Sequence, residues 1–118
     1  MKLLVCGTRK NFVDYKMLVF THLAIMCNSE TELIEGCCKG SADEFAEEFA
    51  QEYGLKIHHF PSTQYNYLKR NIEMAQMCDE VICFWDNFSY GSSHTVATAV
   101  RLGKPVKVVD VSRGGFSG

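Results

Sequence analysis

The sequence lacks several features that would place a protein in a functional class at once. Its 12 lysines and arginines are outnumbered by 14 acidic residues, which gives a formal charge of -2. Proteins that bind nucleic acids carry a basic surface, so we do not expect nucleic acid as a partner. The longest apolar runs are far too short to span a bilayer, and the apolar start at Met1 already breaks at Gly7. We therefore expect neither a membrane span nor a signal peptide.

The six cysteines form no CxxC pair and lie scattered, mostly within apolar segments. Regularly spaced cysteines mark disulfide frameworks and zinc sites, so the scattered ones favour reduced thiols and a cytoplasmic location. A zinc site that combined Cys37 and Cys38 with His58, His59 or His94 would have no recognisable spacing. We expect no metal and no cofactor.

Linkers and internal repeats are also absent. The chain has 118 residues, of which 47% are hydrophobic and 22% charged, as is usual for one soluble globular domain. We expect this domain to cover residues 1–111. The last residues, 112–118, are rich in glycine and serine and predict a flexible tail.

Patterns typical of strands and helices alternate along the chain. Short apolar runs predict strands at residues 3–6, 33–34, 56–60, 80–85 and 106–111. Helices are predicted at residues 15–27, 42–53, 65–77 and 96–102. The second helix is the clearest, because Ser41 and Glu44 form a capping box and Gly54 stops it. The alternation predicts an α/β fold, a single Rossmann-like three-layer domain with a five-stranded parallel sheet of order 3-2-1-4-5.

In such a sheet, ligands bind beyond the carboxyl ends of the strands, where the winding reverses. Three loops rich in glycine, hydroxyl and basic residues converge there. The residues that we expect to bind a ligand in these loops are Gly7, Thr8, Arg9, Gly36, Lys39, Gly40, Ser41, Asp43, Ser89, Gly91, Ser92 and Ser93. Two of the loops lead into helix N-termini, where free amides favour an anion, and Arg9 adds a fork suited to phosphate.

A purely structural role for these loops stays open. Gly36 and Gly40 would also serve to turn the chain, and Ser41 to cap a helix. Asp43 fits two roles, contact with a sugar hydroxyl or complementation of the helix dipole. Neither loop matches a Walker motif or GxGxxG, which argues against ATP hydrolysis and ordinary dinucleotide binding.

The third predicted helix carries polar residues on an otherwise aromatic and apolar face. Tyr67, Arg70, Asn71 and Met74 share this face at helical spacing. We expect Arg70 and Asn71 to point into the site rather than to solvent or an interface. His94 is expected to open the fourth helix and to act as an acid, a base or a phosphate partner; a hydrogen bond to backbone is the alternative.

These motifs together resemble the SLOG superfamily, and within it the small YspA-like branch. The residues that carry the resemblance are Cys6-Gly7-Thr8-Arg9, Gly36-x-x-x-Gly40-Ser41-Ala42-Asp43, Arg70-Asn71-x-x-Met74, Asp79-Glu80-Val81-Ile82 and Ser89-x-Gly91-Ser92-x-His94. The resemblance spans the chain up to about Val111. It implies a Rossmann-like fold that binds or processes nucleotides and their derivatives.

A related family, Lonely Guy, removes the base from a nucleoside 5′-monophosphate by cleaving its N-glycosidic bond. By resemblance, Arg70 falls at that family's arginine, while His94 and Thr95 stand where its acidic residues would be. A carboxylate stabilises the oxocarbenium-like transition state, which a histidine cannot do. Asp43 and Asp86 are the candidate substitutes. If the chain is an enzyme, we expect Arg70 and His94 to be its catalytic residues.

Three functions stay open. The first is a sensor or binding protein for a nucleotide or a nucleotide-derived phosphate ligand. The second is a nucleoside 5′-monophosphate N-glycosidase, a hydrolase of the phosphoribohydrolase type, and the third is a DNA- or protein-interaction module. The slightly acidic balance argues against the third. The resemblance also implies pairing, and we expect a homodimer interface at the aromatic stretch of residues 65–67.

Overall fold

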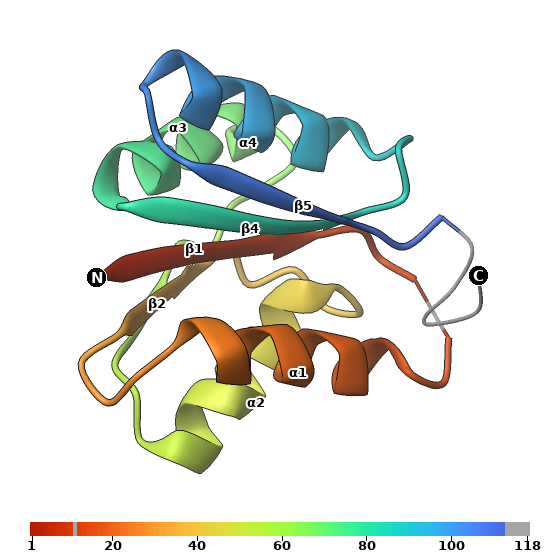
Figure 1. Cartoon of the computed structure of the whole chain (residues 1–118). Helices are drawn as coiled ribbons and strands as arrows, with labels where there is room; N and C mark the ends of the chain where they lie inside the picture. Colours follow the sequence, from red (N-terminus) through yellow and green to blue (C-terminus); the bar gives the residue numbers. More distant parts are fainter. Residues whose placement is uncertain (11, 113–118) are drawn as a thin grey trace.

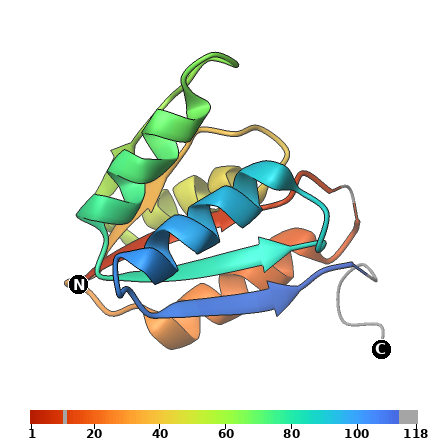
Figure 2. The same cartoon turned by 90° about the horizontal axis from the view of Figure 1, so that it is seen from above.

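Strands and helices alternate in the computed structural model, which describes residues 1–10 and 12–112 (Figure 1). The elements are β1 (Lys2–Gly7), α1 (Tyr15–Met26), β2 (Glu32–Glu35), α2 (Ala42–Tyr53), β3 (Ile57–His59), α3 (Tyr67–Met77), β4 (Glu80–Trp85), α4 (Tyr90–Arg101) and β5 (Val106–Asp110). All strands lie in one parallel sheet of order β3-β2-β1-β4-β5. α1 and α2 cover one face and α3 and α4 the other (Figure 2). The predicted Rossmann-like α/β fold and strand order are confirmed.

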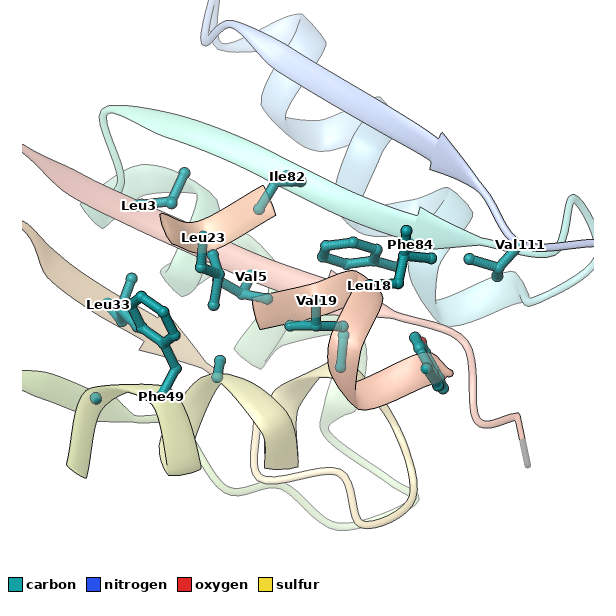
Figure 3. Packing of buried hydrophobic residues seen from close by; sticks show 14 residues of the cluster. Leu3, Val5, Leu18, Val19, Leu23, Leu33, Phe49, Ile82, Phe84 and Val111 are labelled. Atoms are coloured by element: carbon teal, nitrogen blue, oxygen red, sulfur yellow. The ribbon is translucent and has the colours of Figure 1, made fainter. Parts of the chain in front are cut away.

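Two apolar cores lie on the two faces of the sheet. Because side chains alternate along a strand, Leu3 and Val5 of β1 point toward α1 and α2 (Figure 3), and Leu4 points toward α3 and α4. All three side chains are fully buried. The edge strand β5 differs from the prediction of strands covered on both faces, since Val108 remains 46% exposed.

The start of α2 differs in one detail from the predicted capping box. The Ser41 hydroxyl accepts a hydrogen bond from the amide of Asp43 at 3.1 Å, as a helix cap should. The Glu44 carboxylate accepts from the amide of Gly40 at 2.8 Å, and the predicted bond was to the amide of Ser41. Gly54 ends the helix in the left-handed conformation, with φ 69°, as predicted.

The start of α4 was predicted too late in the chain. The Asp86 carboxylate accepts from the amides of Phe88 and Ser89 at 2.8 and 2.9 Å and turns the chain directly after β4. Ser89 then caps the helix, which begins at Tyr90. His94 therefore lies within α4 and does not open it. The start of α3, in contrast, was predicted slightly too early, since α3 begins at Tyr67 and not at residue 65.

Within the part of the chain that the structure describes, no helix is long and apolar enough to cross a membrane. All six cysteines are free thiols. Of the tail predicted at residues 112–118, residues 113–118 lie outside the described residues. Ser112 is held by its amide, which donates to Asp110 Oδ1 at 2.8 Å, and by its carbonyl oxygen, which accepts from Lys10 Nζ at 2.9 Å.

Candidate functional site

A cavity of about 640 Å³ lies at the carboxyl edge of the sheet, where the sequence predicts a ligand site. Its walls come from the end of β1, from the loops after β1, β2, β3 and β4, and from α2, α3 and α4. The predicted residues that line it are Gly7, Thr8, Arg9, Gly36, Asp43, Arg70, Asn71, Ser89, Gly91 and Ser92. The fold therefore brings together residues that lie up to 85 positions apart in the sequence.

Some predicted residues are not among the described residues that line the cavity: Lys39, Gly40, Ser41, Ser93 and His94. Lys39 and Gly40 are exposed. Ser41 is fully buried, and its hydroxyl donates to the carbonyl oxygen of Cys38 at 2.7 Å while it caps α2. Its observed contacts are those of a helix cap, which is the structural role left open above.

The cavity also has walls that the sequence did not predict. Residues 61–64, in the loop after β3, line it, as do Cys6, Cys37, Cys38 and Thr95. A signal was present, because the strand order places β3 beside β2, so that the hydroxyl- and amide-bearing side chains at residues 62–64 end at the same edge. Thr95, the neighbour of His94, lines the cavity from α4 together with Gly91 and Ser92.

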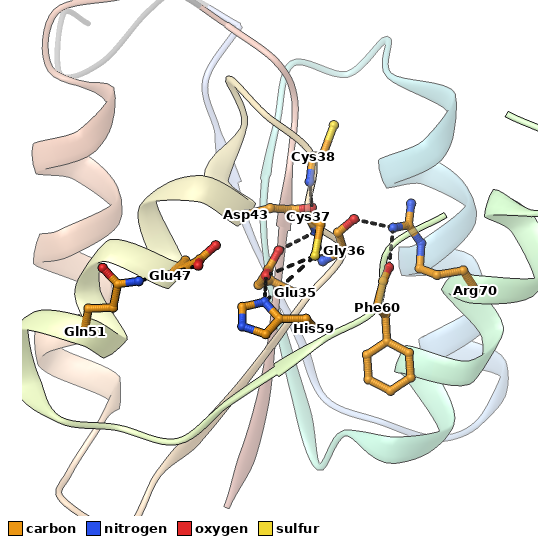
Figure 4. Close-up of polar contacts among 10 residues, drawn as sticks. All are labelled: Glu35, Gly36, Cys37, Cys38, Asp43, Glu47, Gln51, His59, Phe60 and Arg70. Carbon is orange, nitrogen blue, oxygen red and sulfur yellow. Dashed lines mark hydrogen bonds and ion pairs between the residues drawn. The ribbon is translucent and has the colours of Figure 1, made fainter. Parts of the chain in front are cut away.

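Arg70 holds two strand ends together. Its Nη1 donates to the carbonyl oxygens of Gly36 at 2.5 Å and Phe60 at 2.8 Å (Figure 4). Its Nε donates to Oδ1 of Asn71 at 2.9 Å. Because one guanidinium makes all these bonds, its position and its positive charge are fixed before a ligand arrives.

Gly36 makes room for this guanidinium. A Cβ atom at position 36 would lie 2.5 Å from Nη1 of Arg70 and 3.2 Å from a carboxylate oxygen of Asp43. The glycine is thus required by a close side-chain approach and not only by a turn of the chain.

Asn71 links α3 to the first turns of α4. It is 3% exposed, and its Nδ2 lies 3.4 Å from the carbonyl oxygen of Gly91 and 3.4 Å from Nδ1 of His94. His94 thus contacts the site through Asn71. The role of His94 as an acid, a base or a phosphate partner stays a prediction, although His94 is not among the described residues that line the cavity.

The loop after β1 is tied to the end of β4. The amide of Thr8 donates to the carbonyl oxygen of Phe84 at 2.8 Å, and the Thr8 hydroxyl accepts from the amide of Asp86 at 3.1 Å. A Cβ atom at Gly7 would lie 2.8 Å from the same Phe84 oxygen and 2.9 Å from the Cβ of Ala42. Close packing here brings the start of α2 against the central strands.

Arg9 supplies a second guanidinium to the cavity wall. Its side chain is exposed, and Nε lies 3.0 Å from Sγ of Cys38. Two guanidinium groups and the first turn of α4 therefore border one cavity. Guanidinium groups and helix N-termini are the groups with which proteins bind phosphate.

Asp43 is a buried carboxyl group in the same wall. Its Oδ2 accepts from the amides of Gly36 at 3.2 Å and Cys38 at 3.1 Å. Burial raises the pKa of Asp43 to about 7 and nearby Glu35 adds to the rise, although the amides and Arg70 lower it. The group therefore changes charge near neutral pH, a property suited to an acid–base role.

Asp86, the other candidate carboxylate, is engaged in the turn before α4. Burial alone would raise its pKa, but hydrogen bonds from the amides of Phe88 and Ser89 bring it below the ordinary value. It is not among the described residues that line the cavity. Of the two candidates, only Asp43 lines the cavity within the described residues.

Beside the cavity, three side chains that commonly bind metals approach one another. Glu35 Oε1 lies 2.6 Å from Nδ1 of His59 and 3.4 Å from Sγ of Cys37 (Figure 4). Burial, followed by the nearby Glu35, raises the pKa of the Cys37 thiol to about 11, so this cysteine has no thiolate character of its own at neutral pH. The sequence shows no recognisable metal-site spacing for Cys37 and His59, whereas the fold places these two side chains next to each other.

No family model matches the chain, and no curated protein matches its sequence. Among solved structures, the chain is similar to a dodecameric FMN-dependent UbiX-like decarboxylase from Escherichia coli O157:H7. The sequence identity is 14% and the TM-score 0.40, over 90% of this chain and 79% of that one. A similarity of this size says nothing about what this chain binds.

Proposed function

We propose that the protein binds a nucleotide, or another phosphate ester derived from one, in the cavity at the carboxyl edge and acts as a sensor or binding protein. The observation that carries the proposal is the fixed guanidinium of Arg70, which lines a cavity together with Arg9. A prepositioned guanidinium loses little conformational entropy when it binds a phosphate group.

Other features of the cavity support a ligand of this class. Its volume of about 640 Å³ is in the usual range for small-molecule sites. Ser89, Gly91 and Ser92 bring the N-terminal turn of α4 to the wall, where amides and hydroxyls suit phosphate oxygens. Tyr67 and Met74 give the wall an aromatic and apolar part that suits a base. The resemblance to the SLOG superfamily supports the same class of ligand.

A nucleoside 5′-monophosphate N-glycosidase is the second candidate, and the position of Asp43 favours it. His94 and Thr95 stand where the Lonely Guy family has acidic residues, and Asp43 supplies a carboxyl group in the cavity wall in their place. Near pH 7 part of the Asp43 population is ionised and would stabilise positive charge that develops on the sugar. In this reading Arg70 positions the phosphate and His94 acts only through Asn71.

Three further expectations complete the proposal. The slightly acidic chain argues against a DNA-interaction module. Reduced thiols fit a cytoplasmic location. A homodimer through the stretch at residues 65–67 stays a prediction; Tyr65 is 88% exposed there, and sedimentation of wild type and Tyr65→Ser tests it.

Incubation of the purified protein with a panel of nucleoside monophosphates tests both candidates. Thermal stabilisation without release of free base supports the binding protein, because a ligand held only by the native state raises its stability. Free base that appears in wild type and is lost in Asp43→Asn supports the glycosidase. Arg70→Ala should lose both responses, while Arg101→Ala, which removes the same charge from an exposed position outside the cavity, should keep them. No stabilisation and no free base with any nucleotide would refute both.

A further inference from the structure

Glu35, Cys37 and His59 come together because two parallel strands end side by side. β2 and β3 pair in parallel with Glu35 opposite His59, and Cys37 lies two residues beyond the end of β2. Within the described residues, this is the one group of three or more histidine, cysteine and acidic side chains whose ligand atoms all lie within 4.8 Å of one another. One carboxylate, one thiol and one imidazole thus face a common point.

The distances are close to those of a tetrahedral metal site. With metal–ligand bonds of about 2.0–2.3 Å, tetrahedral geometry places pairs of N, O and S ligand atoms about 3.3–3.6 Å apart. Sγ of Cys37 lies 3.4 Å from Oε1 of Glu35 and 3.9 Å from Nδ1 of His59. To bind a metal ion, only the 2.6 Å distance between Glu35 Oε1 and His59 Nδ1 must lengthen, by less than about 1 Å.

The buried carboxylate of Glu35 favours a positive charge close to it. The Glu35 side chain is fully buried, and within the described residues its one ion pair is with His59. Its second oxygen accepts from the amide of Cys37. A carboxylate removed from water is costly unless a cation or strong hydrogen bonds compensate it. His59 is 44% exposed in its side chain, so water can reach a fourth coordination position.

The backbone at Cys37 is held in an uncommon conformation. Its φ is 61°, in the left-handed region that a cysteine rarely adopts. In this conformation the thiol lies near both Glu35 and His59 (Figure 4). Strained residues of this kind persist where the surrounding structure fixes them, often at binding sites.

We propose that Glu35, Cys37 and His59 bind a Zn²⁺ ion, with water as the fourth ligand. A mixed set of thiolate, imidazole and carboxylate is a zinc set, whereas Mg²⁺ and Ca²⁺ prefer oxygen ligands only. The ion takes the place of the thiol proton and bridges β2 to β3. This site is separate from the proposed nucleotide site and does not depend on it, although Cys37 also lies in the cavity wall.

Titration of the metal-free full chain with Zn²⁺, and with Co²⁺ as a spectroscopic probe, tests the proposal. Wild type should bind one Zn²⁺ per chain, and Co²⁺ should give the charge-transfer absorbance of a cobalt–thiolate bond. Cys37→Ser should abolish that absorbance, and His59→Gln should weaken Zn²⁺ binding by at least about tenfold. Both side chains are partly or fully accessible, so these variants should keep the fold, which circular dichroism in the presence of a chelator checks.

Two neighbouring residues supply matched controls. Cys38 contacts Arg9, and His58 pairs with Glu32 at 2.7 Å on the other face of β3. Cys38→Ser and His58→Gln should bind Zn²⁺ as wild type does. A wild-type chain that binds no Zn²⁺, so that Glu35 and His59 form only a hydrogen-bonded pair, overturns the proposal. Binding that survives Cys37→Ser, or that is lost in Cys38→Ser instead, also overturns it.

Discussion

Nη1 of Arg70 lies 2.5 Å from the carbonyl oxygen of Gly36, and a Cβ atom at Gly36 would lie 2.5 Å from that same nitrogen. The glycine and the arginine are thus fitted to each other across the carboxyl edge of the sheet. One residue comes from the loop after β2 and the other from α3, so the pair joins two walls of the cavity.

Gly36→Ala should therefore displace the Arg70 guanidinium. We expect a loss of about 1–3 kcal/mol in the free energy of unfolding, because the added methyl group overpacks the site. Urea denaturation measures this loss. Gly91→Ala is the control for stability, because nothing lies within 4 Å of a Cβ atom built there and its helical backbone tolerates alanine. Equal stabilities of the two variants would contradict the close fit.

Asn71→Leu should destabilise the protein by about 2 kcal/mol, because leucine is similar in size but leaves Nε of Arg70 without its partner at a buried position. Urea denaturation at one pH is sufficient. Gln76→Leu makes the same amide-to-apolar change at an exposed position of α3 and should stay within about 0.5 kcal/mol of wild type. If Gln76→Leu lowered the free energy of unfolding as much as Asn71→Leu does, the hydrogen bond between Arg70 and Asn71 would not be important for stability.

Asp43→Asn should change how stability depends on pH. The pKa of Asp43 is raised to about 7 in the folded protein, while an unfolded aspartate titrates near about 3.9. The folded state therefore binds the proton of Asp43 more tightly than the unfolded state does. The stabilisation that results is complete below about pH 4 and is lost as pH rises through about 7. Between these values the stability of wild type relative to Asp43→Asn should fall by about 1.4 kcal/mol per pH unit, and above pH 7 it should be constant.

Unfolding of both proteins from pH 5 to pH 8 in the presence of a chelator checks this difference. Asp79→Asn serves as the control: a hydrogen bond from the amide of Lys2 lowers the pKa of Asp79, so this carboxylate stays ionised over the whole range. Its difference from wild type should not vary with pH. A flat difference for Asp43→Asn as well would mean that its carboxyl group titrates normally.

Arg9→Gln should weaken the binding of a nucleoside monophosphate by about tenfold, because hydrogen bonds to charged groups contribute about 1.5–3 kcal/mol each. Lys39→Gln removes the same charge from an exposed residue outside the lining of the cavity and should change the affinity by less than about twofold. Calorimetric titration gives both values. A loss that is larger for Lys39→Gln would place the phosphate on the outer side of the loop after β2.

The sequence was sufficient for the fold because its signals are local. The apolar run of β4 and the capped periodicity of α2 each predict one element, and strict alternation then allows few sheet topologies. The position of Arg70 and Asn71 in the cavity wall followed as well, since residues at i, i+3, i+4 and i+7 share one face of a helix.

The site was less predictable where the direction of a side chain depends on an unusual backbone or on tertiary contacts. The left-handed conformation of Cys37, which places its thiol beside His59, carries no sequence signal. The turn at Asp86 lets α4 begin earlier in the chain than predicted, so that His94 lies inside the helix. Two amides donate to the Asp86 carboxylate in this turn, but the sequence shows Asp86 only as a loop residue. The raised pKa of Asp43 arises from burial, which is a property of the assembled fold.

The central claim, a phosphorylated nucleotide at the carboxyl edge of the sheet, is tested most directly by amide chemical shifts during titration with a nucleoside monophosphate. Glycine amides report on both edges, because Gly7, Gly36 and Gly91 line the cavity, whereas Gly54 and Gly103 precede β3 and β5 at the opposite edge. We expect saturable shifts at Gly7, Gly36 and Gly91 and none at Gly54 and Gly103. Shifts confined to Gly54 and Gly103, or no shifts with any nucleotide, would contradict the account.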